Sequence, residues 1–470
     1  MITPAEQFLR SAAEKSADLG HRQTIRRAID TYDGATARGR ARFLDWEAAR
    51  ERSQEIKWEA VNHLDQYLLE FEAKVKQRGG HVFWAETSAD ARSYIQDLAA
   101  RRGVRKVVKS KSMITEEIHL NPALETSGIE VFETDLGEFI VQLRREPPYH
   151  IVTPAMHLTR HDIAALFKEK LGTGDTSDPE ELVAAARRVL RQAFFSAEMG
   201  ISGANFLVAD SGMIAITTNE GNGRLCTSVP RIHVAVAGIE KVVPRADDLA
   251  VLWPVLSTAG TGQALTCYNV LIGGPRAPGE VDGPEEFHVV LLDNGRSELL
   301  ADAEQRDVLQ CIRCGACLNA CPVYRTIGGH AYGTTYQGPI GSVLTPHLRG
   351  IKEFQHLSSA SSLCGACTAT CPVKIDLHHH LLHNRRNAVE TANRSWLERV
   401  GFKLWRWTVV DARRFATMGA LARAGLRLTN GLGLAGTWLD PARAWTKDRA
   451  ALEVPHKSFR ALWRERRGGA

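Results

Sequence analysis

The residues of this chain best suited to chemistry are its cysteines. Seven of the nine lie between Cys311 and Cys371, in two blocks separated by 42 residues. The first block, CIRCGACLNACP, has the spacing C-x2-C-x2-C-x3-C-P, which is typical of ferredoxins that hold two iron–sulfur clusters. At this spacing one tight loop places three thiolates on one cubane cluster, and the fourth cysteine is directed to the other cluster. The sequence therefore predicts iron–sulfur chemistry.

The two cysteine blocks form an internal repeat with an offset of 50 residues. The segments QCIRCGACLNACPV (310–323) and ASSLCGACTATCPV (360–373) are identical at seven of fourteen positions. If each block gives its last cysteine to the other cluster, two ligand sets follow. The first cluster would be held by Cys311, Cys314, Cys317 and Cys371, and the second by Cys321, Cys364 and Cys367.

The second cluster lacks a fourth cysteine, because Ser361 stands where the second block should begin. It is either a 3Fe–4S cluster or a 4Fe–4S cluster with Ser361, Ser362, water or a substrate on the fourth iron. We expect two 4Fe–4S clusters, the second with a non-cysteine ligand. We also expect backbone N–H groups and the cations Arg313, Arg325 and Lys374 to offset the cluster charge and raise the potentials.

Other roles for the cysteines fit less well. Structural zinc takes four ligands, usually as two separated pairs, which does not suit C-x2-C-x2-C. Disulfides are not expected because the N-terminal residues lack the apolar core of a signal peptide, so we expect a cytoplasmic protein. The isolated Cys226 and Cys267 are expected to be buried thiols.

Four histidines, His378, His379, His380 and His383, follow the second block. His379 and His383 are one helical turn apart, a spacing that can clamp a metal ion. The preferred interpretation is a partly exposed helix face beside the cluster.

The elements that must position these residues begin with an α/β region from about 80 to 295. Strands are expected at 104–110, 129–133, 138–143, 150–154, 204–210, 213–218, 232–238 and 287–292, with helical segments at 90–103 and 178–200. This alternation predicts a layered α/β domain with a mostly parallel sheet. A tight hairpin around Asp210–Gly212 makes the sheet mixed.

The remaining segments are helical in pattern. We expect domains at 1–78 (N-terminal helices), 79–298 (α/β), 299–392 (an all-helical cluster domain) and 393–470 (a helical tail). Within the first, Phe43–Val75 is expected to form one or two helices that cap the α/β domain. The basic tail carries Trp396, Trp405 and Trp407, and we expect it to pack on the cluster domain; the alternative is a face for a partner or a membrane surface.

Composition excludes some classes of protein. Charged residues make up 24% of the chain with a net charge of +5, and the two signs are interleaved, so we do not expect nucleic-acid binding. The longest uncharged run, Val251–Pro275, contains prolines and glycines and is interpreted as loops and short buried elements, not a bilayer span.

Two polar loops after predicted strands are candidate substrate contacts. In ITTNEGNGRL (216–225), Glu220, Asn222 and Arg224 suit a carboxylate or a phosphate, although a solvated turn explains the loop equally well. KSKSM (109–113) suits an anion bound at a helix N-terminus. The alternative explanation is simple N-capping of that helix by Ser110 or Ser112. The absence of a G-x-G-x-x-G motif disfavours a Rossmann-type dinucleotide site.

These motifs together resemble the lactate-utilisation iron–sulfur protein B family. The resemblance runs from about residue 60 to 470, through VVKSKSMITEEIHLN, ADSGMIAITTNEGNGRLCTSVP, CIRCGACLNACPVYRTIGGHAYGTTYQGPIGSVLTP and SLCGACTATCPVKIDL. It implies a LUD α/β domain, related to sugar-phosphate isomerases and CoA transferases, followed by a helical ferredoxin-type domain. The resemblance also implies that the second block has three cysteines throughout the family, so Ser361 is not a substitution peculiar to this chain.

The implied function is electron transfer within a cytosolic three-protein complex that oxidises L-lactate to pyruvate. The implied partners are a cysteine-rich iron–sulfur protein and a second LUD-domain protein. Two rival hypotheses remain: the LUD domain is itself an enzyme for a 2-hydroxy acid or a phosphorylated or CoA-linked compound, or the protein is an iron–sulfur redox sensor. No catalytic residue is predicted in the LUD domain.

Overall fold

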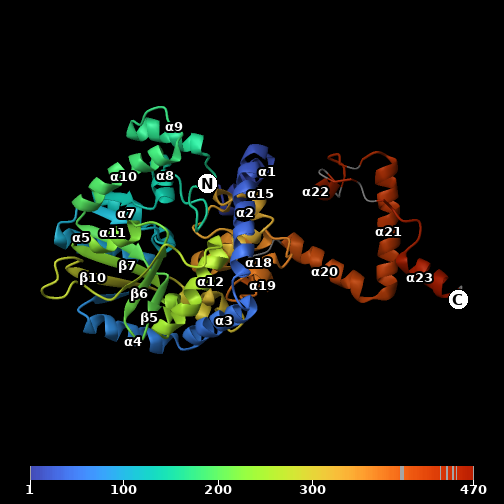
Figure 1. The fold of residues 1–470 in the computed structure, drawn as a ribbon. Helices are drawn as coiled ribbons and strands as arrows, with labels where there is room; N and C mark the ends of the chain where they lie inside the picture. The colour runs from blue at the N-terminus through green and yellow to red at the C-terminus, as the bar shows by residue number, and fades with distance from the viewer. Residues whose placement is uncertain are drawn as a thin grey trace. The chain divides into compact units, whose positions relative to one another are not determined.

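The computed structural model describes residues 2–391, 396–434, 436–440, 443–446, 449–450 and 453–468 (Figure 1). The chain divides into two compact units, Met1–Thr391 and Ala392–Ala470.

The first unit is built around a six-stranded sheet in which every strand pair is parallel. The strand order is β1-β10-β7-β4-β2-β3, with bounds β1 His81–Ala85, β2 Lys106–Lys109, β3 Glu130–Glu133, β4 Met199–Gly203, β7 Ile232–Gly238 and β10 Glu286–Leu292. Parallel sheets are covered on both faces, and accordingly all seven residues of β7 are buried.

Helices cover the two faces of this sheet. Along β10, Val289 and Leu291 pack with Phe71 of α4 (Leu64–Gln77), whereas Val290 and Leu292 pack with Ile95 of α5 (Ser88–Arg102). Because side chains alternate along a strand, α4 and α5 lie on opposite faces (Figure 1). Helix α10 (Pro179–Ser196) packs on the sheet near β2. It follows the N-cap Asp178, where the sequence predicts a helical segment to begin.

A second, four-stranded sheet has the order β8-β5-β6-β9. It comprises β5 (Phe206–Val208), β6 (Met213–Thr218), β8 (Val242–Val243) and β9 (Tyr268–Ile272). The predicted hairpin around Asp210–Gly212 is the antiparallel β5–β6 pair. It lies outside the six-stranded sheet, so the prediction of one mixed sheet is wrong.

Two other predicted strands are also wrong. Residues 138–143 lie in α8 (Leu136–Arg144), because Asp135 caps a helix there by accepting a hydrogen bond from the Glu138 amide. Residues 150–154 form an irregular loop. The segment 251–275, interpreted as loops and short buried elements, holds most of α12 (Leu249–Thr261) and strand β9. Strands β1 and β4 were not predicted.

From residue 293 to residue 391 the described chain is helical and contains no strand. Its helices are α13 (Arg296–Ala301), η3 (Arg306–Gln310), α14 (Ala316–Ala320), α15 (Tyr324–Ile327), η4 (His330–Tyr332), α16 (Gly338–Arg349), α17 (Ile351–Ser359), α18 (Ala366–Thr370) and α19 (Leu377–Thr391).

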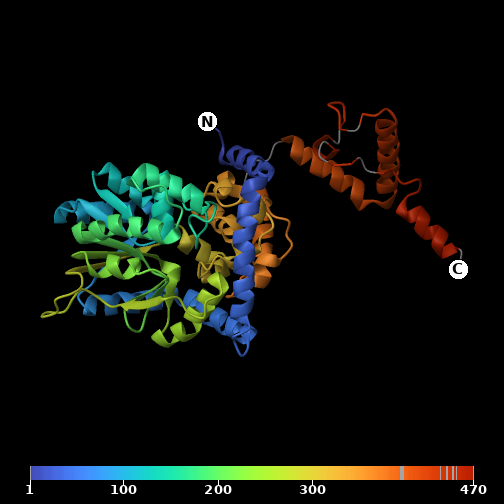
Figure 2. The same cartoon turned by 45° about the horizontal axis from the view of Figure 1, so that its top comes forward.

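The N-terminal helices tie the helical segment to the α/β layers. These are α1 (Pro4–Ala17), α2 (Leu19–Arg40), α3 (Trp46–Asn62) and α4. In both views α1 and α2 lie against the helical segment around α15 (Figure 2). Ile25 of α2, Leu252 of α12 and Leu318 of α14 belong to one buried apolar cluster, so the α/β and cysteine-bearing parts share a core.

The second unit contains α20 (Trp396–Val410), α21 (Ala412–Gly431), α22 (Arg443–Thr446) and α23 (Phe459–Gly468). Neither α20 nor α21 buries a side chain, and Trp396, Trp405 and Trp407 are at least half exposed. The predicted packing of this tail on the cluster domain stays a prediction, and residues 392–395 of the predicted helical run lie outside the described residues. Within the described ranges, no helix has both the length and the apolar character needed to cross a bilayer.

Candidate iron–sulfur centre and the adjoining cavity

The two cysteine loops have the same backbone conformation. Arg313 and Gly315 have φ angles of 60° and 80°, and 50 residues later Leu363 and Gly365 have φ angles of 55° and 77°. Each loop leads into a five-residue helix, α14 or α18, and these two helices are in contact. The repeat in the sequence is therefore also a structural repeat.

Glycine is required at position 315 for two reasons. Its left-handed conformation is strained for other residues, and a Cβ atom there would lie 3.0 Å from Val152 and 3.1 Å from His150. The loop of the first block is thus packed directly on the loop that contains residues 150–152 of the α/β region.

The cysteines come together in two groups, and no disulfide joins any of the nine. In the first group, the thiols of Cys311, Cys314 and Cys371 all act electrostatically on Cys317. In the second, Cys364 acts on Cys321, and Cys321 acts on Cys367. The last cysteine of each block thus acts on cysteines of the other block, which is compatible with the two predicted ligand sets; the sets themselves stay a prediction.

The first group provides a buried site rich in hydrogen-bond donors. Burial raises the pKa of Cys371 to about 12 and also raises the pKa values of Cys314 and Cys317. Backbone N–H groups face the sulfurs: Arg313 donates to Cys311 and Ile375 donates to Cys371, both at 3.4 Å. Buried thiolates require a compensating cation, and backbone N–H groups directed at sulfur are the usual surroundings of such clusters. The residues present therefore fit an iron–sulfur cluster.

The second group is closer to solvent. Cys364 is exposed, and the backbone N–H of Ala366 and the hydroxyl of Ser362 lower its pKa, whereas burial raises the pKa of Cys367 to about 11. A small pocket beside these residues is lined by Cys321, Cys364, Cys367, Ser361, Ser362 and His378, among others.

His378, one of the four histidines after the second block, is a candidate fourth ligand that the sequence analysis did not assign to the cluster. Its Nδ1 is 2.8 Å from the Thr368 hydroxyl and 3.0 Å from the Asp376 carboxylate, which leaves Nε2 for another partner. A carboxylate on one imidazole nitrogen is the common support for a metal on the other. The signal in the sequence was its position seven residues after Cys371.

The predicted cations differ in their surroundings. Arg313 lies beside Cys311, and Arg325 lies near Cys321 while pairing with Asp33. Lys374 pairs instead with two glutamates of α3.

Sequence reasoning missed two arginines of the N-terminal helices. Arg50 donates two hydrogen bonds, of 3.0 and 2.8 Å, to the carbonyl of Cys371, and Arg40 lies near Cys314. The N-terminal helices therefore supply positive charge to the first group.

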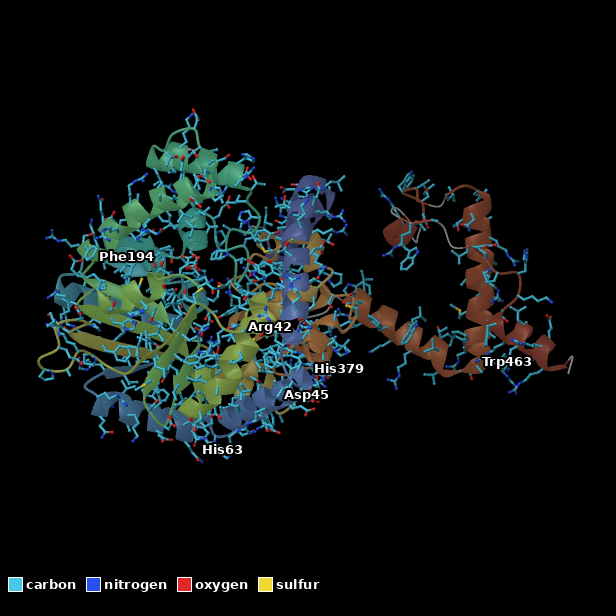
Figure 3. The ribbon with its side chains drawn as sticks, viewed as in Figure 1. Arg42, Asp45, His63, Phe194, His379 and Trp463 are labelled. Carbon is cyan, nitrogen blue, oxygen red and sulfur yellow. The ribbon has the colours of Figure 1, made fainter. Side chains whose placement is uncertain are left out.

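The histidine clamp expected as an alternative is not formed by His379 and His383. Among the described residues, His379 shares a candidate ligand group with Asp376 and His378 rather than with His383. His379 lies at the surface, with its Nδ1 2.5 Å from Asp376 (Figure 3). The interpretation as a partly exposed helix face agrees with this arrangement.

Of the two isolated cysteines, Cys226 is buried as predicted and contacts the Thr134 hydroxyl at 3.2 Å. Cys267 is exposed, so that prediction is wrong. It lies in the loop before β9, the edge strand of the smaller sheet.

A cavity of about 470 Å³ lies between the C-terminal ends of the parallel strands and the first cysteine loop. It is lined by residues that follow β2, β3, β4 and β7, by residues 151–156 and α12, and by Arg313 and Cys314. The C-terminal edge is where open α/β sheets bind ligands.

This cavity brings the two candidate loops together. Lys111, Ser112, Glu220 and Asn222 line it, as do Ser110 and Asp135. Arg224 is exposed and does not line the cavity. Lys109 does not line the cavity either; its ammonium group pairs with the Glu133 carboxylate at a distance of 2.7 Å. Ser112 precedes α6 (Met113–Glu117) but makes no side-chain capping bond, so N-capping does not explain it.

A buried ionic network connects the strand ends to the cysteine loop. Arg296 donates to Glu117 in a bidentate pair at 2.9 and 2.7 Å and to Glu240 at 2.6 Å. Glu240 also accepts from Arg313 at 3.3 Å, and Glu117 accepts from the Tyr336 hydroxyl at 2.6 Å. The cations lower the pKa of Glu240 to about 2 despite its burial, so it stays ionised.

Comparison with known proteins assigns both halves of this arrangement. Residues 68–292 match the LUD domain, and residues 307–375 match a 4Fe-4S dicluster domain. A crystal structure of a DUF162 family protein from Deinococcus radiodurans matches 49% of this chain and 98% of its own at 13% identity, and its TM-score of 0.28 supports no further argument.

Relatives are similar over nearly their whole length. Lactate utilization protein B of Bacillus licheniformis is 44% identical over 464 residues, covering 97% of this chain and 96% of its own. The protein of the same name from Bacillus cereus is 45% identical over 433 residues and covers 90% of each chain. The chain therefore belongs to the lactate utilization protein B family, with a LUD domain and a 4Fe-4S dicluster domain.

Proposed function

We propose that this protein is the iron–sulfur electron-transfer component of a system that oxidises L-lactate to pyruvate. The observation that carries the proposal is the crossed grouping of seven cysteines from two repeated loops. Cys311, Cys314, Cys317 and Cys371 hold the first 4Fe–4S cluster. Cys321, Cys364 and Cys367 hold the second, with a non-cysteine group on its fourth iron.

The two sites would have different tasks. Clusters bound there supply one-electron transfer. Around the first site, burial excludes water, while N–H groups directed at the sulfurs stabilise added negative charge and so raise the potential. Around the second site, the exposure of Cys364 supports electron exchange with a partner at this cluster. Ser361, Ser362 and His378 are the candidate protein ligands of its fourth iron.

The wider proposal concerns architecture and partners. The α/β region 79–298 is of the sugar-phosphate isomerase and CoA-transferase type, and region 299–392 is a helical ferredoxin domain between the N-terminal helices 1–78 and the tail 393–470. The partners are a cysteine-rich iron–sulfur protein and a second LUD-domain protein in the cytoplasm. For the basic, tryptophan-bearing tail the preferred prediction stays packing on the cluster domain, and the alternative is a surface for a partner or a membrane.

Anaerobic purification tests the cofactor part of the proposal. Two 4Fe–4S clusters predict about eight irons per chain, and one 4Fe–4S with one 3Fe–4S cluster predicts about seven. Electron paramagnetic resonance (EPR) spectra of both redox states distinguish the two types. An active, correctly folded preparation without iron would refute the proposal.

A second experiment tests the function. The protein is mixed with its two co-purified partners and L-lactate without air, and cluster reduction is followed optically. Clusters that stay oxidised while the partners are intact would show that the electrons of lactate do not pass through this protein.

A further inference from the structure

We propose that the cavity beside Cys314 binds a small organic acid, whose carboxylate is held by Lys241 and Arg313. This inference rests on the proposed function and deepens it by assigning a ligand class to the LUD cavity. It is carried by unpartnered polar groups, by the charge of the lining and by the position of the cavity.

The first observation is that several donors lining the cavity lack partners. Lys241 lies at the end of η1 (Ile239–Lys241), is half-buried, and its ammonium group makes no hydrogen bond or ion pair with the described residues. The side chain of Arg313 is only 9% exposed, yet its Nη1 is buried without a partner. The buried hydroxyl of Ser112 is also unpartnered. Buried donors without acceptors are costly, so a ligand oxygen is the natural complement.

The second observation is that Arg313 is held in place before any ligand arrives. Its guanidinium lies 4.6 Å from the centre of the Tyr336 ring, and its Nη2 donates to Glu240. Glu240 and Tyr336 are in turn held by Arg296 and Glu117. A fixed, planar guanidinium matches a carboxylate, and little conformational entropy is lost when it binds one.

The charge of the lining favours a single negative charge on the ligand. Lys111 lies 3.6 Å from Asp135, and Arg313 pairs with Glu240. Lys241 and Glu220 remain. Burial together with the nearby Asp135 raises the pKa of Glu220, which favours its neutral form. Burial and the nearby Arg313 lower the pKa of Lys241 to about 8, so its ammonium group still carries most of its charge at pH 7. Among the lining side chains, one positive charge is thus left without its own carboxylate, which suits a monoanionic ligand better than a phosphate dianion.

The rest of the lining suits a ligand with oxygen substituents. Hydroxyls of Ser110, Thr217, Ser257 and Thr261 line the cavity, together with the amide of Asn222. The hydroxyls of Thr217, Ser257 and Thr261 already donate within the protein, so they can accept from a ligand hydroxyl. The amide N–H groups of Asn222 can donate to a hydroxyl or keto oxygen next to a carboxylate. The volume exceeds that of a three-carbon acid, so bound water or a longer acid has room.

The position of the cavity connects the ligand to the first cysteine group. Cys314 lines the cavity, and both Lys241 and Arg313 act electrostatically with Cys311. An anion there opposes the negative charge that a cluster gains on reduction. Ligand binding therefore lowers the reduction potential of the first cluster, and reduction weakens ligand binding by the same factor.

The test is calorimetry on the full-length, cluster-containing protein without air. The probes are L-lactate, pyruvate, the neutral amide of L-lactate and inorganic phosphate. We expect the two carboxylates to bind at least 10-fold more tightly than the amide or phosphate, because a charged hydrogen-bonded contact contributes about that factor. Lys241→Met should weaken carboxylate binding at least 10-fold, and Lys241→Arg should stay within about 3-fold of the unchanged protein. Lys168→Met, a change at an exposed lysine of α9 (Arg160–Leu171), should have no effect.

Four results would each overturn the inference: no carboxylate binding, equal binding of the amide, tighter binding of phosphate, or a Lys241→Met protein with unchanged affinity. If Lys241→Met does not fold, Ser112→Ala replaces it, with an expected loss of about 3-fold from one hydrogen bond. Iron content and EPR spectra of the same samples separate the two proposals. Intact clusters without carboxylate binding refute only the cavity site, whereas missing clusters refute the proposed function.

Discussion

The buried network around Arg296 predicts a large loss of stability when this single side chain is removed. Arg296 is 1% exposed and neutralises Glu117 and Glu240, whose side chains are 7% and 1% exposed. Arg296→Met keeps most of the volume but leaves both carboxylates without this cation. Glu240 retains Arg313, and Glu117 retains hydrogen bonds from Tyr336 and Asn294.

The magnitude follows from the cost of an uncompensated buried charge. Removing one partner of a buried ion pair costs about 3–5 kcal/mol, and the remaining donors keep the loss within that range. A matched control is Arg102→Met, which breaks an Arg–Glu pair of 2.7 Å with Glu286 at the surface. Because the Arg102 side chain is 49% exposed, water replaces the lost contact and the expected cost is about 0.2–1 kcal/mol.

Urea unfolding without air, followed by circular dichroism, measures both variants. The deficit of Arg296→Met should depend on pH. Arg296 lowers the pKa values of Glu117 and Glu240 in the unchanged protein, so their ion pairs stabilise the fold above the ordinary glutamate pKa. In the variant, burial raises these pKa values instead, so stability falls as pH rises and the deficit is larger at pH 8 than at pH 5.5. The double variant with Glu117→Gln should recover part of the loss.

The comparison of the two variants at pH 8 tests whether the buried network stabilises the fold. If Arg296→Met costs no more than Arg102→Met at pH 8, the buried network does not hold the strand ends to the cysteine loop.

Two further predictions concern the cysteines and a buried carboxyl. The last cysteine of the second block is assigned to the first cluster, so Cys371→Ala should alter the same EPR signal as Cys311→Ala. The EPR signal of the second cluster, which Cys367→Ala alters, should stay intact in Cys371→Ala. The control Cys267→Ala, at an exposed isolated thiol, should change neither EPR signal and leave the iron content unchanged. If Cys371→Ala and Cys367→Ala disturb one and the same signal, the crossed assignment is wrong. Burial and a neighbouring carboxylate raise the pKa of Glu138 in the folded protein. Its contribution to stability is therefore full below the ordinary glutamate pKa, and it is lost as the pH rises through the raised pKa of the folded state. Thermal melting of Glu138→Gln should therefore match that of the unchanged protein near pH 5 and exceed it at pH 8, and equal melting at both values would contradict this.

The crossed cysteine assignment stays a prediction, and the sequence alone could make it because the geometry that it uses is local. Three cysteines at intervals of three residues leave one loop conformation that wraps a cluster, and Gly315 and Gly365 mark it twice. Exchange of the last cysteine then requires only that the two loops meet, which the contact between α14 and α18 provides.

Errors in the predicted elements arose where short apolar runs carry no periodicity. Residues 138–143 suit a buried strand or a buried helix equally well, and the Asp135 cap decides for the helix. Strand β4 was hidden because the helical pattern of α10 runs on past Ser196, where the helix ends.

By itself, the sequence determined the cysteine repeat, the α/β and helical halves, and the two polar loops after β2 and β6. Only the tertiary structure decided that these loops form one cavity with Lys241 and Arg313, and that Arg296 joins that cavity to the cysteine loop. These residues lie on segments far apart in the chain, so no spacing or periodicity connects them. Their proximity is a consequence of parallel strands ending at one edge of a sheet and of a shared apolar core that presses the cysteine loop against that edge.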